Sequence, residues 1–284
     1  MLLSAEKPVT ALLENTIPLD NTTAASFFKF EYLINSSSFY RTSCIFDNIF
    51  TKDATEFNIW APAATGVKVN INEAGAGNAS NACKIGAYIL EKVSSSKEWN
   101  GIWTIKLIGD LGDYYYDYTI TTTDAYHKDS NQTQTNNIQD PYSVAVSEDG
   151  KYSYITDTST ISPEGWDNDR HVYVDSTKAN TVYRISVKDF SSDAESGMTA
   201  GGKYSAFTQK GAKVNSAGEL VSGIDYLKEL GVTTVQLAPF ADYEADSEYE
   251  ILNYNAPETS YASNPSDCKT VIKECKISYS LSAS

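Results

Sequence analysis

The polar residues best placed to do chemistry are carboxylates in the last part of the chain. Glu244 and Asp246, and then Glu248 and Glu250, form two pairs with a spacing of two in a polar stretch. Two neighbouring carboxylates can divide the acid and base roles of a hydrolysis between them. In so polar a stretch, however, this spacing is more typical of solvated surface. We therefore interpret both pairs as surface residues rather than as a catalytic centre.

Other catalytic chemistries find little support in the sequence. The cysteines at positions 44, 83, 268 and 275 form no CxxC pair, and His127 and His171 complete no zinc site at a usual spacing. We expect free thiols, no metal and no cofactor. The stretch Gly75–Asn78 lacks the spacing and the following helix of a dinucleotide-binding loop.

Composition narrows the class of partner. The 284 residues carry a formal net charge of −15, with 19 Lys and only three Arg. An acidic chain with so few arginines is poorly suited to nucleic acid or phosphate, so neutral substrates fit better. Hydrophobic residues make up 41% of the chain, enough for a sizeable core.

The first residues predict no targeting segment. The stretch 1–20 has no basic start and no unbroken apolar run, and nothing in the chain has the length of a membrane-spanning helix. Four Asn-x-Ser/Thr sequons, at Asn21, Asn35, Asn78 and Asn131, matter only in a secreted eukaryotic protein. We expect a cytoplasmic protein that does not bind membranes and is a monomer.

Alternating apolar residues predict a β-sandwich in the first half. Phe57 and Ile59 share one face of a strand, and a second strand places Val67, Val69 and Ile71 together. Gly101–Asp110 and Gly112–Thr121 are further strands, and Asp149-Gly150 predicts a hairpin turn. In the Tyr-rich strand, either Tyr114, Tyr116 and Tyr118 or Tyr115 faces solvent. Short strands at such intervals are typical of a β-sandwich.

The pattern changes near residue 178. Thr181–Phe190 reads as a strand, Leu220–Leu230 as a helix capped by Gly231, and Val232–Ala238 as a strand buried on both faces. A strand, a helix and a second strand make a βαβ unit with parallel strands. Asp189 and Asp242 follow the two strands, where turn or helix-cap carboxylates are the simpler interpretation.

Several motifs, in order, resemble those of one enzyme family. Phe57–Val69 (FNIWAPAATGVKV) resembles the F-x-W-A-P-x-A-x-x-V opening of the module that precedes the barrel in glycogen- and starch-debranching enzymes. Gln139–Asp157 resembles the hairpin that follows this module, and Asn253–Pro265 (NYNAPETSYASNP) resembles the N-Y-N-x-P-E-x-S-Y loop of type I pullulanases. The resemblance covers roughly residues 38–276.

The resemblance implies a glycoside hydrolase of family 13, in the α-amylase superfamily. It implies a sandwich similar to carbohydrate-binding module 48 and the start of a (β/α)₈ barrel. The family hydrolyses α-1,6 bonds in pullulan, starch or glycogen. Its substrate-side residues correspond to Tyr249, Tyr254 and Asn255 here, and Trp60 and Trp103 are candidate sugar platforms in the sandwich. Core packing is the alternative reading of both tryptophans.

The chain also departs from the family. Asp246–Ile251 (DSEYEI) stands where the family has Asn-Trp-Gly-Tyr-Asp-Pro. Of these six family residues, this chain keeps only the tyrosine, as Tyr249. Arg184 and Ser186 replace the Glu and His of the family's first barrel strand. A whole barrel takes about 250 residues, and from Val182 this chain has 103, so we predict a barrel that is incomplete and truncated.

We therefore predict a mainly β protein with three parts. Residues 1–50 are a lead-in, 51–178 the immunoglobulin-like sandwich, and 179–284 the incomplete TIM barrel. The family implies α-glucan as the partner. Because no residue corresponds to the catalytic Asp, Glu and Asp of the family, we predict no catalytic residue and no glucan cleavage by this chain. The alternative function is a noncatalytic α-glucan-binding module.

Overall fold

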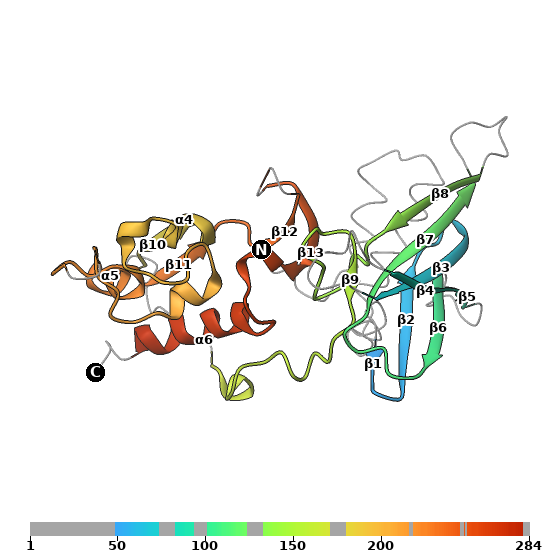
Figure 1. Cartoon of the computed structure of the whole chain (residues 1–284), viewed down its shortest axis with the longest axis horizontal. Helices are drawn as coiled ribbons and strands as arrows, with labels where there is room; N and C mark the ends of the chain where they lie inside the picture. The colour runs from blue at the N-terminus through green and yellow to red at the C-terminus, as the bar shows by residue number, and fades with distance from the viewer. Residues whose placement is uncertain are drawn as a thin grey trace, which may run out of the picture. The chain divides into compact units, whose positions relative to one another are not determined.

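The computed structural model describes most of the chain after the first 48 residues (Figure 1). The described residues are 49–73, 83–93, 101–123, 133–170, 180–215, 218–244, 247 and 249–280. Residues 1–48 of the predicted lead-in, including Cys44, lie outside these ranges, whereas its last two residues are described. Both histidines, Asp246, Glu248 and the boundary predicted near residue 178 also lie outside the described ranges. The chain forms two compact units. The first takes its residues from the ranges up to Asn70, Gly86–Leu111 and Tyr118–Ile138, and the second from Ile71–Ile85, Gly112–Asp117 and Gln139 onward.

Two sheets confirm the predicted sandwich class. One has the strand order β1-β2-β6-β5, and the other has the order β4-β3-β7-β8, with β9 also beside β7 (Figure 1). The strands are β1 Ile49–Phe50, β2 Ala54–Trp60, β3 Ala64–Glu73, β4 Cys83–Ile89, β5 Glu91–Lys92, β6 Ile102–Ile108, β7 Tyr115–Thr123, β8 Thr133–Ile138 and β9 Ser153–Tyr154. β2 pairs antiparallel with β6 along its whole length, from Ala54 opposite Ile108 to Trp60 opposite Ile102.

The period-2 pattern predicted which faces form the core. Phe57 and Ile59 of β2 and Val67, Val69 and Ile71 of β3 are buried, as expected for strands with one face inside.

The structure also shows how the tyrosines of the Tyr-rich strand are placed. Tyr116 and Tyr118 are fully buried, whereas Tyr114 and Tyr115 are half-buried. Tyr116 and Tyr118 therefore face the interior, and Tyr114 does not follow them.

The predicted hairpin turn around Gly150 is confirmed. Ser147 and Tyr152 are joined by a backbone hydrogen bond of 2.8 Å, and Gly150 adopts a φ of 63° that suits glycine. We call Gln139–Asp157 the linker hairpin. Its strand β9 pairs antiparallel with the first residues of β7.

A βαβ arrangement follows in the second unit. β10 (Val182–Ile185) and β11 (Thr234–Leu237) pair in parallel, and α5 (Gly223–Glu229) lies between them in sequence. Gly231 follows α5 with a φ of 75°, which confirms the predicted cap.

Three details of this prediction were wrong. The strand predicted to reach Phe190 ends at Ile185, because Ser186 caps a short helix, α4 (Val187–Ser191). β11 is half-buried rather than buried on both faces, because within the described residues it pairs only with β10. The helix predicted over Leu220–Leu230 is shorter, because α5 begins at Gly223 after its N-cap Ser222 and ends at Glu229 before its C-cap Leu230.

Several further elements belong to the second unit. They are β12 (Ala241–Tyr243), β13 (Ile251–Pro257) and α6 (Asp267–Ser280), with short 3₁₀ turns η3 (Trp166–Asn168), η5 (Ala194–Ser196), η6 (Tyr204–Thr208) and η7 (Thr259–Tyr261).

Two apolar clusters hold the helices of this unit against the parallel strands. One joins Val187, Tyr204, Phe207, Tyr261 and Val271, and Ile185, Val235 and Leu237 of the strands pack against it. The other joins Ile224 and Leu227 of α5 with Val232, and Tyr183 and Val235 pack against it.

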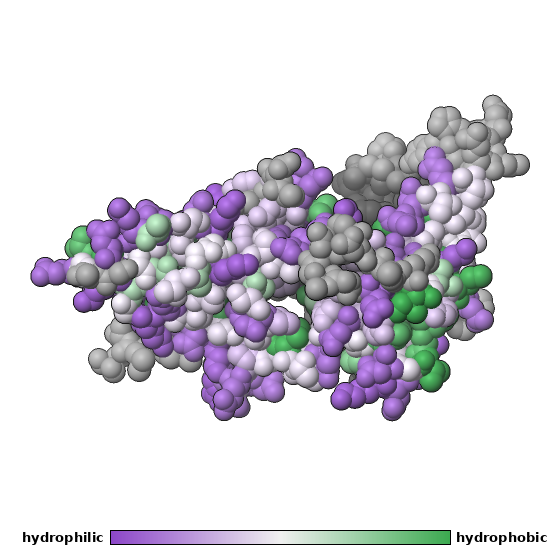
Figure 2. Space-filling model, in the orientation of Figure 1, coloured by the Kyte–Doolittle hydropathy of each residue, from purple (hydrophilic) through white to green (hydrophobic). Residues whose placement is uncertain are grey.

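The surface is mainly hydrophilic, with separate hydrophobic patches (Figure 2). Within the described part of the chain, no helix combines the length and apolar character needed to cross a membrane. The same residues contain no cluster of three or more metal-ligating side chains. Cys268 and Cys275 are free thiols.

Gly101 provides a test of the sandwich. Its φ is 91°, and a Cβ there would lie 2.7 Å from the Pro62 Cβ, so Gly101→Ala combines backbone strain with a steric clash. We expect it to lower the free energy of unfolding by roughly 2–4 kcal/mol in urea titrations. Gly109, with a φ of 122° and open space around it, is the matched control. Gly109→Ala should cost only the strain, about 1 kcal/mol. Equal losses in the two variants would show that the contact with Pro62 is unimportant.

Candidate functional site

The residues predicted to contact substrate lie on β13 and on the loop before it. Tyr249 and Tyr254 expose 66% and 81% of their surface. Arg184, at the family's glutamate position, donates a hydrogen bond from Nη2 to the Tyr249 hydroxyl over 3.1 Å. The bond fixes the hydroxyl end of the ring, while most of the side chain stays open to solvent. The loop is closed by a backbone bond of 3.0 Å from Glu244 N to Glu250 O.

Asn255 has a different environment from the two tyrosines. Its Nδ2 donates to the Pro141 carbonyl over 2.8 Å, and its backbone N–H donates to the Asn253 Oδ1 over 2.9 Å. The Asn255 amide nitrogen therefore holds the linker hairpin.

Asn253, which the sequence did not single out, makes the companion contact. Its side chain is 1% exposed, and its Nδ2 donates to the Asp140 carbonyl over 2.9 Å. The Thr259 hydroxyl adds a bond of 3.1 Å to the Val146 carbonyl. The Asn253–Pro265 segment, which we call the NYN loop, thus docks on the linker hairpin. Asn253 and Glu258 both belong to the motif that resembles the pullulanase loop, so membership in this motif was the one sequence feature that marked them.

Asp140 and Glu258 are buried carboxylates with structural partners. Asp140 accepts a bond of 2.7 Å from the Tyr116 hydroxyl and one of 2.9 Å from the Tyr142 N–H. Glu258 accepts a bond of 2.8 Å from the Ser260 N–H, which caps η7. Both carboxylates are used to fix turns of the backbone.

Asp242 is the carboxylate with the most unusual environment. It is 2% exposed and accepts a bond of 3.4 Å from the Gln139 Nε2, which also donates to the Gly150 carbonyl. Burial is the main cause that raises the pKa of Asp242 to about 6. The negative charges of Glu258 and Asp149 also raise it, and the hydrogen bond from Gln139 lowers it. Its counterpart Asp189 is exposed, so the two do not form a buried pair.

The candidate tryptophans belong to the first unit. Trp103 is 7% exposed, its Nε1 donates to the Ala61 carbonyl over 3.0 Å, and the Lys92 ammonium lies 5.6 Å from the ring centroid. Trp60 is half-buried at the end of β2. The burial of Trp103 agrees with the core alternative for that residue.

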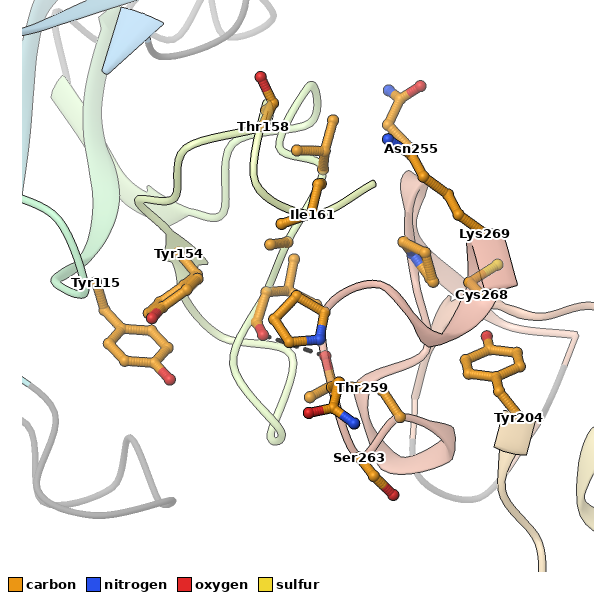
Figure 3. A pocket seen from close by; sticks show the side chains of 17 residues that line it. Tyr115, Tyr154, Thr158, Ile161, Tyr204, Asn255, Thr259, Ser263, Cys268 and Lys269 are labelled. Carbon is orange, nitrogen blue, oxygen red and sulfur yellow. Dashed lines mark hydrogen bonds between the residues drawn. The ribbon is translucent and has the colours of Figure 1, made fainter. Parts of the chain in front are cut away.

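A cavity of about 480 Å³ lies within the second unit (Figure 3). Its walls come from the linker hairpin, from the segment after it, from the NYN loop and from the start of α6. Figure 3 shows Tyr115 and Tyr154 on one side and Cys268, Lys269 and Tyr204 on the other. Among the substrate-side candidates, Asn255 lines it, whereas Tyr249 and Tyr254 do not.

The fold just described is that of solved pullulanase structures. The Bacillus acidopullulyticus pullulanase matches with a TM-score of 0.69 and 31% identity, over 82% of this chain and 28% of that chain. The Paenibacillus barengoltzii pullulanase, in a complex with maltohexaose and α-cyclodextrin, matches with a TM-score of 0.69 and 27% identity, over 81% and 36%.

Sequence relatives carry the same name. The Bacillus subtilis pullulanase is 30% identical over 238 residues, which cover 80% of this chain and 29% of the relative. Pullulanase 1 of Arabidopsis chloroplasts is 30% identical over 217 residues, which cover 74% and 20%. No family model matches the chain. The matches support a relationship to pullulanases, and the chain spans less than a third of these two relatives.

The contacts of Asn253 yield a testable expectation. Asn253→Ala leaves the buried Asp140 carbonyl and the Asn255 N–H without their partner, so we expect a loss of roughly 2–4 kcal/mol in the free energy of unfolding. It should also speed proteolysis within the linker hairpin. Asn255→Ala is the matched control, because that side chain is exposed and its loss should cost about 1 kcal/mol or less. Wild-type resistance of Asn253→Ala to protease would contradict this role.

Asp242 yields a second expectation. Because its pKa is higher in the folded state than the ordinary 3.8, folding favours the protonated form. The stabilising effect is complete below pH 3.8 and is lost as the pH rises through about 6. Asp242→Asn should therefore raise the free energy of unfolding by roughly 1–3 kcal/mol at pH 7.5 and have little effect near pH 4. The exposed Asp189→Asn is the control. The same gain at both pH values would rule out this explanation.

Proposed function

We propose that this chain is a type I pullulanase-family protein of glycoside hydrolase family 13, in which these 284 residues contact α-glucan without cleaving it. The observation that carries the proposal is the ordered likeness to pullulanases, in sequence and structure, over about four-fifths of the chain. The family implies hydrolysis of α-1,6 bonds in pullulan, starch or glycogen. The first unit would correspond to a module similar to carbohydrate-binding module 48.

Exposed tyrosines support contact with a neutral glucan. Tyr249 and Tyr254 are the most exposed aromatic side chains of the described residues, and both belong to the segment that resembles the family's substrate side. A sugar ring has an apolar face that packs on an aromatic ring, and hydroxyls that need hydrogen-bonding groups at its edge. Arg184 supplies such a group beside Tyr249. The complex of the Paenibacillus pullulanase with maltohexaose is consistent with this class of ligand.

The environments of the buried carboxylates support the proposal that the chain does not cleave glucan. A retaining glycosidase needs two carboxyl groups about 5–5.5 Å apart on either side of the bond. Among the described residues, Asp140 and Glu258 are committed to the backbone, and Asp242 is enclosed beneath the linker hairpin. None of them corresponds to the catalytic residues that the family resemblance implies. A noncatalytic α-glucan-binding module is the second candidate, and the exposed tyrosines favour it equally.

Native affinity electrophoresis with and without pullulan tests the proposal. We expect pullulan to retard the chain, and Tyr249→Ala and Tyr254→Ala each to weaken apparent affinity by roughly two- to tenfold. Tyr226→Ala, on α5 and 45% exposed, is the matched control and should migrate like wild type. Parallel assays should detect no release of reducing ends from pullulan.

The possible outcomes separate the two halves of the proposal. Unchanged mobility of the wild-type chain in pullulan would overturn glucan contact. If pullulan still retards both tyrosine variants as strongly as wild type, the glucan must bind at a surface other than Tyr249 and Tyr254. Steady release of reducing ends, lost when the protein is heat-denatured, would overturn the absence of cleavage.

A further inference from the structure

We propose that the cavity of the second unit is a binding site for a neutral, largely apolar ring compound, separate from the exposed tyrosines proposed to contact glucan. The cavity volume of about 480 Å³ falls within the range of roughly 300–1,000 Å³ that small-molecule sites occupy. Two stretches far apart in sequence, 144–161 and 255–269, build most of it, together with Tyr115 and Tyr204. The hydrogen bond from Thr259 to Val146 joins the two stretches across one wall. The space is therefore a fixed feature of the unit.

Aliphatic and aromatic groups make up most of the walls. Val146, Ile161 and Pro257 line the cavity together with the Tyr115 and Tyr154 rings. The two rings are tilted by 52° with their centroids 5.0 Å apart, and Figure 3 shows them at one end of the cavity. Such walls favour a ligand with apolar ring faces, because each contact removes apolar surface from water.

Four of the polar side chains that line the cavity, those of Tyr154, Tyr204, Asn255 and Thr259, already donate a hydrogen bond within the protein. The Tyr154 hydroxyl donates to the Asp113 carboxylate over 2.6 Å, and the Tyr204 hydroxyl to the Phe240 carbonyl over 3.1 Å. Thr259 and the Asn255 amide donate to backbone carbonyls of the linker hairpin. A polyhydroxylated sugar entering the cavity would lose water without gaining these donors. The cavity therefore suits a ligand with few hydroxyl groups.

Charge points to a neutral ligand. Lys269 is the one ionised side chain among the lining residues. Its Nζ donates to the Ser162 hydroxyl over 2.9 Å and lies 5.5 Å from the centroid of the Trp166 ring. The Cys268 thiol also lines the cavity, and burial raises its pKa to about 11, so it is uncharged at neutral pH. The described residues of the walls include no carboxylate that could pair with a cationic ligand, and the Lys269 ammonium already has a hydroxyl and an aromatic ring as partners.

Titration with the neutral fluorophore N-phenyl-1-naphthylamine tests the site on the full chain. We expect saturable enhancement with one fluorophore per chain, and at least about tenfold weaker binding to Ile161→Trp, which fills the cavity. The matched control is Ile108→Trp, at an 82% exposed position of β6 outside the cavity. Maltotriose should leave the bound fluorophore in place.

Thiol modification gives a second readout that needs no variant. Cys268 lines the cavity, whereas Cys275, on the same helix and with a pKa also raised to about 11, does not. The fluorophore should slow N-ethylmaleimide labelling of Cys268 severalfold and leave Cys275 unchanged, as peptide mass spectrometry can resolve. Equal effects on both thiols, non-saturable fluorescence, or weakening by Ile108→Trp alone would overturn the proposal. Displacement by maltotriose would also overturn it, because the cavity would then be a sugar site.

Discussion

The second unit depends on hydrogen bonds from side-chain amides of β13 to backbone carbonyls of the linker hairpin. Asn253 and Asn255 donate to residues 113 and 114 positions earlier in the chain. A buried carbonyl without a partner costs free energy comparable to a lost hydrogen bond, so the bond from Asn253 to the buried Asp140 carbonyl fixes where the hairpin can sit on β13. The exposed bond from Asn255 to the Pro141 carbonyl adds less. Once it sits there, the hairpin covers Asp242 and closes one wall of the cavity. The unusual carboxylate and the apolar space therefore have the same structural origin.

The docking of the hairpin buries carboxylates, and each buried carboxylate needs hydrogen-bond partners to replace the water that it loses. Asp140 receives a tyrosine hydroxyl and a backbone N–H, an arrangement that compensates a charged group for lost water. Asp242 receives one long bond from Gln139 and faces the charges of Glu258 and Asp149. Burial is the main cause of the raised pKa of Asp242, and its one long hydrogen bond does not offset that effect. A perturbed carboxylate beside a hairpin is thus explained by packing, and it implies no catalytic role for Asp242.

The sequence predicted the fold where one physical signal dominated. Alternation placed Phe57, Ile59 and Val69 in the core, because a strand with one buried face has no other way to arrange them. It failed where local and distant effects compete. Thr181–Phe190 has strand composition, yet the Ser186 hydroxyl caps α4 and ends the strand after four residues. The contacts of Asn253 could not be inferred at all, because a side-chain bond across 113 residues leaves no periodic pattern. Exposed Tyr249 and Tyr254 could be named only through the family resemblance.

The two proposed binding sites differ in how many of their hydrogen-bonding groups remain available to a ligand. Around Tyr249 and Tyr254 the rings are open to solvent, and polar groups beside them can exchange water for sugar hydroxyls at little cost. Inside the cavity, rings of the same residue type have their hydroxyls bound to Asp113 and to a backbone carbonyl. Tyrosine content alone would therefore assign both places to carbohydrate. The hydrogen-bond partners distinguish them, because a ligand can use only the donors that the fold has not already used.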